Sequence, residues 1–360
     1  MNKIAIMTAG GDCPGLNSII KTVVMSACKK NIKVLGIVDG YIGFVEKKYM
    51  VLNEKSVEDI ENIGGTILGS SNKECPFHYP SRTKKGEYED RVLDGIESLK
   101  NLGVEGLIVI GGDGTLDSAR VIHEKGLPTV GIPKTIDNDM SASNPTIGFD
   151  TAVETAVEAI RKIRTTASSH RRVAVVEIMG RTSGYLTLHS GFASGADIIL
   201  LPELEYDLDI VIKKIKNVFN SGKRYCIIAM SEAAKQKGKD EVIAKVIKDS
   251  FEQKRYGGAS VILAEIIEKE TGYEARNTIL GHIQRGGEPS TSDIILAARL
   301  GEYALGLLLN NESGHIVGVS NYNLAKIKFP NERIPRILEV TKDDLVQTAK
   351  NMGVCFGDTL

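Results

Sequence analysis

The sequence predicts an α/β protein made of two doubly wound, Rossmann-like domains with parallel sheets. Short apolar runs alternate with amphipathic segments along most of the chain. An uninterrupted apolar run is typical of a parallel strand that helices cover on both faces. The runs are too numerous for one small sheet, and 360 residues, 42% of them apolar, are enough to form two cores.

The apolar runs have the length of buried strands, and segments with apolar residues at helical spacing separate most of them. We expect strands at 3–9, 33–40, 106–112, 128–135, 171–180, 196–203 and 224–233. We expect helices at 16–30, 89–103, 114–126, 151–166, 183–194, 207–220 and 239–254.

The polar stretch IGFDTAVET, residues 147–155, opens a long predicted helix and marks the junction between the two predicted domains. We expect the first domain to comprise residues 1–148 together with about 288–340. We expect the second domain to comprise residues 149–287 together with a C-terminal helix at 341–360.

Charge and composition exclude several classes of protein. Lys and Arg number 45 and Asp and Glu 46, so no strong field attracts nucleic acid or a membrane surface. No apolar run reaches the roughly 18 residues of a membrane helix. The first residues run directly into a strand, unlike a signal peptide, and five scattered cysteines show no metal-binding spacing. We therefore expect a cytoplasmic protein with small-molecule substrates and no nucleic-acid or membrane partner.

Two glycine-rich loops follow predicted strands, where doubly wound sheets bind their ligands. In TAGGDCPGLN, Gly11 lets the backbone approach an anion at the start of the next helix. In IGGDGTLDSA, Gly112 and Gly114 flank Asp113, which could hold Mg²⁺ against phosphate oxygens. The alternative is that Asp113 only caps the helix, but the glycines favour phosphate by about three to one. Neither loop is a dinucleotide fingerprint or a P-loop.

The stretch GIPKTIDNDM, residues 131–140, leaves the strand that should lie beside GGDGT. Taken alone, these residues favour a simple turn by roughly two to one. The neighbouring glycine loops reverse that preference. Asp137 could then accept a proton from an attacking hydroxyl, and Asp139 could help to place a metal through water.

Arginines gather at the ends of later strands, where they could recognise phosphate in a bidentate manner. The candidates are Arg172, Arg181, Arg276 and Arg285, with Glu232 and His282 nearby. A single surface arginine rarely has a special role, and His282 alone could equally be a loop hydrogen-bonder. Glycine loops in one domain and arginines in the other suit phosphoryl transfer from a nucleotide to a phosphorylated acceptor.

The motifs TAGGDCPGLN, GGDGT, PKTIDND, IGFDTA, SSHRR, MGR and GHIQRGG occur in this order over nearly the whole chain. They resemble the 6-phosphofructokinase family, in particular its bacterial-type, mixed-substrate or ATP-using members. The resemblance implies the phosphofructokinase fold, with the nucleotide and Mg²⁺ on the first domain and the sugar phosphate on the second. It implies ATP-dependent phosphorylation of fructose 6-phosphate at its 1-hydroxyl, a step of glycolysis.

The resemblance also implies roles for individual residues. Asp137 matches the catalytic base, Arg181 the arginine that stabilises the transferring group, and Thr135 a residue beside it. Asp113 matches the magnesium residue. The implied donor-binding residues are Gly11, Tyr41, Asn72, Lys73, Gly112, Asp113, Gly114 and Thr115. Asn72 stands where ATP-using members have an arginine, and Lys73 would supply a point charge there.

The implied sugar-phosphate site draws on more than one subunit. Its residues are Thr135, Ile136, Asp137, Arg172, Met179, Gly180, Arg181, Glu232, Arg276, His282, Ile283, Gln284 and Arg285. In the family, the positions of Arg172 and Arg276 reach in from a neighbouring subunit. A homo-oligomer is therefore expected, at least a dimer, and tetramers are usual in the family.

Two positions in the sequence give opposite indications of which phosphoryl donor the protein uses. ATP-using members resemble GGDG with PGTIDND, and pyrophosphate-using members resemble GGDD with PKTIDND. This chain combines Gly114 from the first pattern with Lys134 from the second. A carboxylate at 114 would crowd and repel an α-phosphate, so Gly114 favours ATP over pyrophosphate by about four to one.

Three other classes compete with this interpretation. NAD kinases and lipid kinases also contain GGDGT, but they lack MGR and GHIQRGG. A non-catalytic nucleotide-sensing subunit would be suspected if Asp113 or Asp137 were replaced, and both are present, which places it below roughly one in ten. A nicotinamide dehydrogenase on a doubly wound fold would need the dinucleotide fingerprint.

Overall fold

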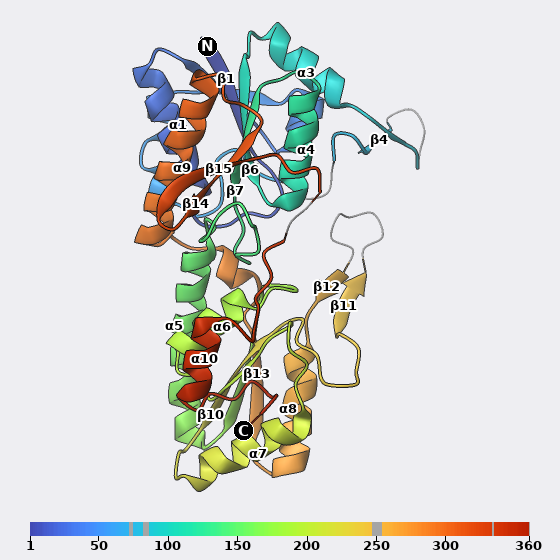
Figure 1. The fold of residues 1–360 in the computed structure, drawn as a ribbon, viewed down its shortest axis with the longest axis vertical. Coiled ribbons are helices and arrows are strands. Elements are labelled where there is room, and N and C mark those ends of the chain that lie inside the picture. Colours follow the sequence, from blue (N-terminus) through green and yellow to red (C-terminus); the bar gives the residue numbers. More distant parts are fainter. Residues whose placement is uncertain (72–74, 82–85, 247–253, 333–334, 360) are drawn as a thin grey trace.

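The computed structural model describes residues 1–71, 75–81, 86–246, 254–332 and 335–359. Two sheets lie one above the other along the longest axis of the molecule (Figure 1). The first has seven strands in the order β15-β14-β7-β6-β1-β2-β3, and the second has four in the order β13-β8-β10-β9. The predicted α/β class is confirmed.

Each sheet takes its strands from distant parts of the chain. The first contains β1 (Lys3–Thr8), β2 (Lys33–Ile37), β3 (Tyr49–Leu52), β6 (Gly106–Gly111), β7 (Thr129–Pro133), β14 (His315–Ser320) and β15 (Asn323–Lys328). The second contains β8 (Val173–Ile178), β9 (Ile198–Leu200), β10 (Cys226–Ser231) and β13 (Ala275–Ile279). Two short hairpins pair β4 (Tyr79–Pro80) with β5 (Tyr88–Glu89) and β11 (Ile243–Val246) with β12 (Lys254–Tyr256).

Helices cover both faces of both sheets (Figure 1). Those before the junction are α1 (Leu16–Lys29), α2 (Tyr41–Glu46), α3 (Val92–Asn101) and α4 (Asp113–Glu124), with the short η1 (Glu54–Val57) and η2 (Ile60–Asn62). Those after it are α5 (Phe149–His170), α6 (Tyr185–Ala193), α7 (Leu208–Asn220), α8 (Ala259–Thr271), η3 (Gly281–Arg285), α9 (Thr291–Leu309) and α10 (Asp344–Asn351). No helix among the described residues is long and apolar enough to cross a bilayer.

The continuous apolar runs follow from this double coverage. Ile4 and Ile6 of β1 belong to the core shared with α1 and α9, whereas Ala5 and Met7 belong to the core shared with α2, α3 and α4. Successive side chains of a strand point to opposite faces, so a strand covered on both faces must be apolar at every position. The sheet edges differ from the all-parallel prediction, because β3 and β15 run antiparallel to their neighbours.

The predicted helix at 239–254 is wrong. Residues 243–246 form β11, which pairs antiparallel with β12. The stretch VIAKV is short and rich in β-branched residues, so it suits a strand as well as a helix, and pairing with residues 254–256 decides for the strand. Residues 247–253 of that prediction lie outside the described part of the chain.

The predicted C-terminal helix at 341–360 is much shorter in the structure. It spans Asp344–Asn351, begins at the capping carboxylate of Asp343 and ends before Gly353, which has a φ of 88°. Cys355 then forms a parallel bridge with Ile198 at the edge of the second sheet. Glycine at a positive φ ends a helix readily, which explains the early stop.

The buried carboxylate of Asp293 joins α9 to the start of α5. It accepts hydrogen bonds from the backbone N–H of Gly148 (2.8 Å) and of Thr151 (2.9 Å) and from Oγ1 of Thr151 (2.5 Å). Only 1% of its surface is exposed. Free N–H groups at a helix N-terminus need acceptors, and Asp293 supplies them from 142 residues away in sequence.

We expect Asp293→Ala to lower the free energy of unfolding by about 2–4 kcal/mol, because buried donors would lose their acceptor. Urea unfolding followed by circular dichroism measures the change. Asp209→Ala is the matched control, since Asp209 lies exposed in the first turn of α7, and it should cost about 0.5 kcal/mol or less. Equal losses in the two variants would contradict the role of Asp293.

Candidate active site

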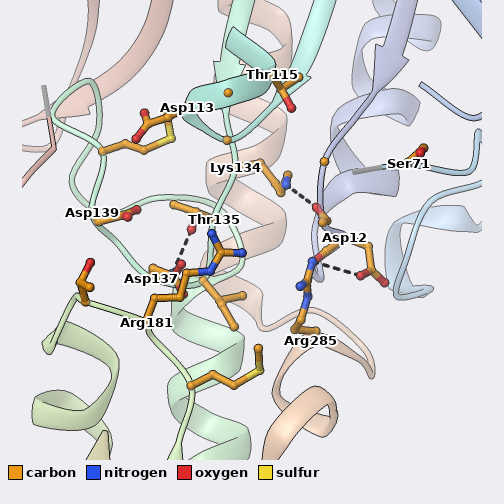
Figure 2. A pocket seen from close by; sticks show the side chains of 18 of the residues that line it. Asp12, Ser71, Asp113, Thr115, Lys134, Thr135, Asp137, Asp139, Arg181 and Arg285 are labelled. Atoms are coloured by element: carbon orange, nitrogen blue, oxygen red, sulfur yellow. Dashed lines mark hydrogen bonds and ion pairs between the residues drawn. The ribbon is translucent and has the colours of Figure 1, made fainter. Parts of the chain in front are cut away.

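A cavity of about 390 Å³ lies between the carboxyl ends of the two sheets (Figure 2). The loops after β1, β6 and β7 form one wall, and the loop after β8 together with Arg285 forms the other. Of the predicted site residues, the cavity is lined by Gly11, Tyr41, Gly112, Asp113, Gly114, Thr115, Lys134, Thr135, Ile136, Asp137, Met179, Arg181 and Arg285.

The first glycine turn is held from behind. Gly10 has a φ of 81°, its N–H donates to the carbonyl of Ser71 (2.9 Å), and its carbonyl accepts from Oγ of Ser70 (2.5 Å). The buried ammonium of Lys134 donates to the carbonyl of Gly11. Burial lowers the pKa of Lys134 from its usual value. Lys134 thus lines the cavity while its ammonium binds the backbone of this turn.

The second glycine turn opens α4. Gly112 is the N-cap with extended backbone, Asp113 is the first helical residue, and no side chain caps the helix. The alternative role of Asp113 as a simple N-cap is therefore wrong. Tyr41 holds this turn by donating from its hydroxyl to the carbonyl of Thr115 (2.7 Å). The N-terminus of α4 and the carboxylate of Asp113 both face the cavity, as phosphate and Mg²⁺ would require.

Three carboxylates lie along one side of the cavity, those of Asp113, Asp137 and Asp139 (Figure 2). Burial raises the pKa of Asp139 to about 7, and the charges of Asp137 and Asp113 add to the effect. Among the described residues, no three Asp, Glu, His or Cys side chains form a complete metal site. Mg²⁺ commonly uses one or two carboxylates together with substrate phosphates, so this acidic wall fits it.

The loop that carries Asp137 is fixed by its backbone. The N–H of Asp137 donates to Oγ1 of Thr135 (3.1 Å), and its carbonyl accepts from Oγ of Ser183 (2.8 Å). The next residue, Asn138, is buried with a φ of 53°, and its Oδ1 accepts from the N–H of Thr146 (3.1 Å). A carboxylate on such a loop is held in place before substrate arrives.

The loop after β8 places Arg181 opposite the acidic wall. Gly180 has a φ of 137°, and a Cβ there would lie 2.6 Å from the carbonyl oxygen of Ser183, so only glycine fits. The N–H of Arg181 donates to Oε1 of Glu232 (3.0 Å) at the end of β10. Burial raises the pKa of Glu232 to about 7.

Arg285 bridges the two halves of the molecule. Its Nε and Nη2 donate to the carbonyl of Asp12 at 3.0 and 2.9 Å, and Nη2 lies 3.4 Å from the Asp12 carboxylate. A Cβ on Gly11 would overlap this guanidinium, so glycine at 11 leaves room for Arg285 as well as for a ligand.

The structure does not bring every predicted residue to the cavity. Arg172 and Arg276 lie at the amino ends of β8 and β13, at the opposite end of the second sheet, where both bind Glu274. His282 and Ile283 are exposed, and the buried Gln284 donates to the carbonyl of Gly281 (3.1 Å). Asn72 and Lys73 lie outside the described residues.

Several cavity residues were missed by sequence reasoning. Asp12 and Ser71 belong to loops that were recognised, and their positions next to Gly11 and Asn72 could have drawn attention to them. Thr182 follows Arg181 directly. Tyr256 gave no sequence indication, because it lies just beyond residues 239–254, which were expected to form a helix.

We expect Glu232→Gln to stabilise the protein more at pH 8 than at pH 5. The pKa of Glu232 in the folded protein, about 7, lies above the ordinary glutamate value of 4.5, so folding of the wild type favours the protonated carboxyl. Wild-type stability therefore falls as the pH rises from 4.5 to 7, and the variant escapes this loss of about 1–3 kcal/mol. Urea unfolding at both pH values measures it.

The matched control is Glu205→Gln at an exposed glutamate, which should change stability by about 0.5 kcal/mol or less at either pH. If the free energies of unfolding of wild type and Glu232→Gln differed by the same amount at pH 5 and pH 8, Glu232 would not titrate as inferred.

Comparison with known proteins agrees with this arrangement. Residues 3–308 match the family profile described as Phosphofructokinase. The chain is 42% identical to ATP-dependent 6-phosphofructokinase 2 of Clostridium perfringens (strain 13 / Type A), covering 99% of both chains. It is 41% identical to a pyrophosphate–fructose 6-phosphate 1-phosphotransferase of Dictyoglomus thermophilum, covering 90% of this chain and 91% of the relative.

Solved structures give the same result. The fold is similar to phosphofructokinase from Saccharomyces cerevisiae, with a TM-score of 0.80 and 28% identity over 98% of this chain and 47% of that one. A pyrophosphate-dependent phosphofructokinase from Marinobacter aquaeolei, 16% identical, shares the fold with a TM-score of 0.79 over 99% of this chain and 92% of that one. The predicted resemblance is confirmed, and the chain belongs to the phosphofructokinase family.

Proposed function

We propose that the protein is an ATP-dependent 6-phosphofructokinase that converts fructose 6-phosphate to fructose 1,6-bisphosphate. The observation that carries the proposal is the single cavity in which two glycine turns and three acids face Arg181. Curated relatives named ATP-dependent 6-phosphofructokinase, at 40–42% identity over 98–99% of the chain, support the activity. MGR and GHIQRGG, which NAD kinases and lipid kinases lack, argue against those alternatives.

In the proposed mechanism Asp137 accepts the proton of the sugar 1-hydroxyl as that oxygen attacks the γ-phosphorus of ATP, and ADP leaves. The guanidinium of Arg181 stabilises the negative charge on the transferring group, and Thr135 lies beside it. Asp113, with Asp139, would hold Mg²⁺, which when bound neutralises charge on the donor phosphates. Catalysis then depends mainly on positioning and electrostatics.

We assign the two walls of the cavity to the two substrates. The donor wall comprises Gly11, Tyr41, Gly112, Asp113, Gly114 and Thr115, with Asn72 and Lys73 from the loop outside the described residues. The acceptor wall comprises Thr135, Ile136, Asp137, Met179, Arg181 and Arg285. We assign Gly180, Glu232, His282, Ile283 and Gln284, which do not line the cavity, to the same acceptor site. The positions of Met179, Arg181 and Arg285 on the cavity support the second assignment.

The oligomeric state belongs to the same proposal. Arg172 and Arg276 lie at the far end of the second sheet from the cavity of their own chain. We infer that they complete the acceptor site of a neighbouring subunit, in a homo-oligomer that is at least a dimer and usually a tetramer in this family. We also propose a cytoplasmic location.

The proposed domain boundaries remain 1–148 with about 288–340, and 149–287 with 341–360. The membership of β14 and β15 in the first sheet supports the first pair, and the bridge between Cys355 and Ile198 supports the second.

Pyrophosphate is the competing donor, because one relative carries that activity in its name and Lys134 lies on the cavity. The ammonium of Lys134, however, binds the carbonyl of Gly11, so it supports a glycine turn of the donor wall. Gly114, in the first turn of α4, adds no charge to the cavity. These contacts support ATP as the donor.

The proposal is tested by assaying fructose 1,6-bisphosphate formation from fructose 6-phosphate and Mg²⁺ with ATP or with pyrophosphate. We expect product with ATP. We expect Asp137→Asn to lower kcat by roughly 10²–10⁴-fold with little change in either KM, because only the proton acceptor is lost. If Asp137→Asn were as active as the wild type, the proposed mechanism would be refuted. If the wild type made no product with either donor, the proposed function would be refuted.

Gly114→Asp is expected to weaken ATP use sharply, raising KM for ATP at least about tenfold, because a carboxylate in the first turn of α4 repels an α-phosphate. KM for fructose 6-phosphate should stay within about twofold. Gly114→Ala is the control that adds bulk without charge. Unchanged ATP kinetics in the aspartate variant would overturn the donor argument.

A further inference from the structure

Tyr256 is a cavity residue that the proposed mechanism does not use. It is the last residue of β12, in the hairpin that the chain inserts between β10 and α8. In Figure 1 this hairpin lies to one side of the region between the two sheets. Tyr256 lines the cavity together with Arg181 and Thr182.

The backbone just after Tyr256 is fastened to β8 by a buried carboxylate. Glu177, 2% exposed, accepts from the N–H of Gly258 (2.9 Å) and from both the N–H (2.9 Å) and Oγ (2.8 Å) of Ser260. Gly257 has a φ of 140° and Gly258 a φ of 91°, a conformation that favours glycine at both positions. Charge-assisted hydrogen bonds to a buried acceptor hold this segment firmly.

This anchor determines which wall of the cavity Tyr256 belongs to. Glu177 is followed within the same strand and its exit loop by Met179 and Arg181, which form the acceptor wall. The glycine turns of the donor wall come instead from β1 and β6 of the other sheet. Tyr256 therefore lies on the side where the sugar phosphate is proposed to bind.

A tyrosine suits a sugar phosphate on chemical grounds. Its ring can cover the C–H face of a sugar, and its hydroxyl can donate to a phosphate oxygen or exchange hydrogen bonds with a sugar hydroxyl. The other acceptor-wall side chains on the cavity are those of Thr135, Ile136, Asp137, Met179, Arg181 and Arg285. None of these six side chains has an aromatic ring, so among the described residues of this wall Tyr256 supplies the aromatic surface.

We propose that Tyr256 is a binding residue for the acceptor sugar phosphate, with its ring against the sugar and its hydroxyl bonded to the ligand. The inference rests on the proposed function and extends the acceptor site onto a hairpin that none of the recognised motifs contains. Through Tyr256, the β11–β12 hairpin contributes to the specificity of the enzyme for its acceptor sugar phosphate.

The test is steady-state kinetics of Tyr256→Ala and Tyr256→Phe, with KM measured separately for fructose 6-phosphate and for ATP. We expect Tyr256→Ala to raise KM for fructose 6-phosphate about tenfold and Tyr256→Phe about threefold, with KM for ATP within about twofold. Tyr322→Ala and Tyr322→Phe are matched controls, since Tyr322 is 91% exposed, and they should behave as wild type.

The possible outcomes distinguish the inference about Tyr256 from the proposed function on which it rests. A wild type that makes no product from fructose 6-phosphate refutes the proposed function and the inference with it. An active wild type with both Tyr256 variants unchanged refutes the inference alone, as does a rise in KM for ATP that exceeds the rise for the sugar phosphate. If thermal unfolding shows that the alanine variant is misfolded, the phenylalanine variant decides by the same criterion.

Discussion

The structure depends on one constraint, that parallel strands buried on both faces can place polar side chains only where the strands end. The interior of β1, β6 and β7 is apolar at nearly every position, and their glycine turns and acids begin at the carboxyl ends. In the second sheet, the polar Arg181 likewise follows the carboxyl end of the buried strand β8. Because these ends face one another across one cavity, chemistry from distant segments is concentrated there.

Ionisable groups buried in this cavity, and in the case of Glu232 next to it, work against stability. The pKa values of Asp139 and Glu232 rise to about 7, and that of Lys134 falls, in each case chiefly because burial disfavours the charged form. A protein selected only for stability would place such groups at the surface. Their presence together, beside glycine turns, indicates a site arranged to meet charged ligands.

Polar contacts between the two halves hold the walls of the cavity in register. Ser183 binds the carbonyl of Asp137, and Arg285 binds Asp12. Near the chain end, the N–H of Arg336 donates to the carbonyl of Asp139 (2.6 Å), and its guanidinium lies 4.2 Å from the Tyr185 ring centroid. Each contact joins a loop of one sheet to a segment on the other side, so the acids and Arg181 keep a defined spacing.

The sequence by itself determined the features that depend on near neighbours in the chain. Apolar runs such as residues 106–111 predict buried strands, and the turns around Gly11 and Asp113 follow from local glycine chemistry. The motif order was enough to predict the family and many of the residues that line the cavity. These inferences succeed because burial on both faces and turn geometry restrict residue choice locally.

Only the tertiary structure decided the features that depend on distant partners. Residues 243–246 form a strand because they pair with residues 254–256. Glu177 binds the backbone just after Tyr256 and so holds Tyr256 at the cavity. Arg172, predicted by motif to reach the site of a neighbouring subunit, lies at the far end of its sheet from the cavity of its own chain. No local pattern reports such outcomes, because they follow from packing between segments that are far apart in sequence.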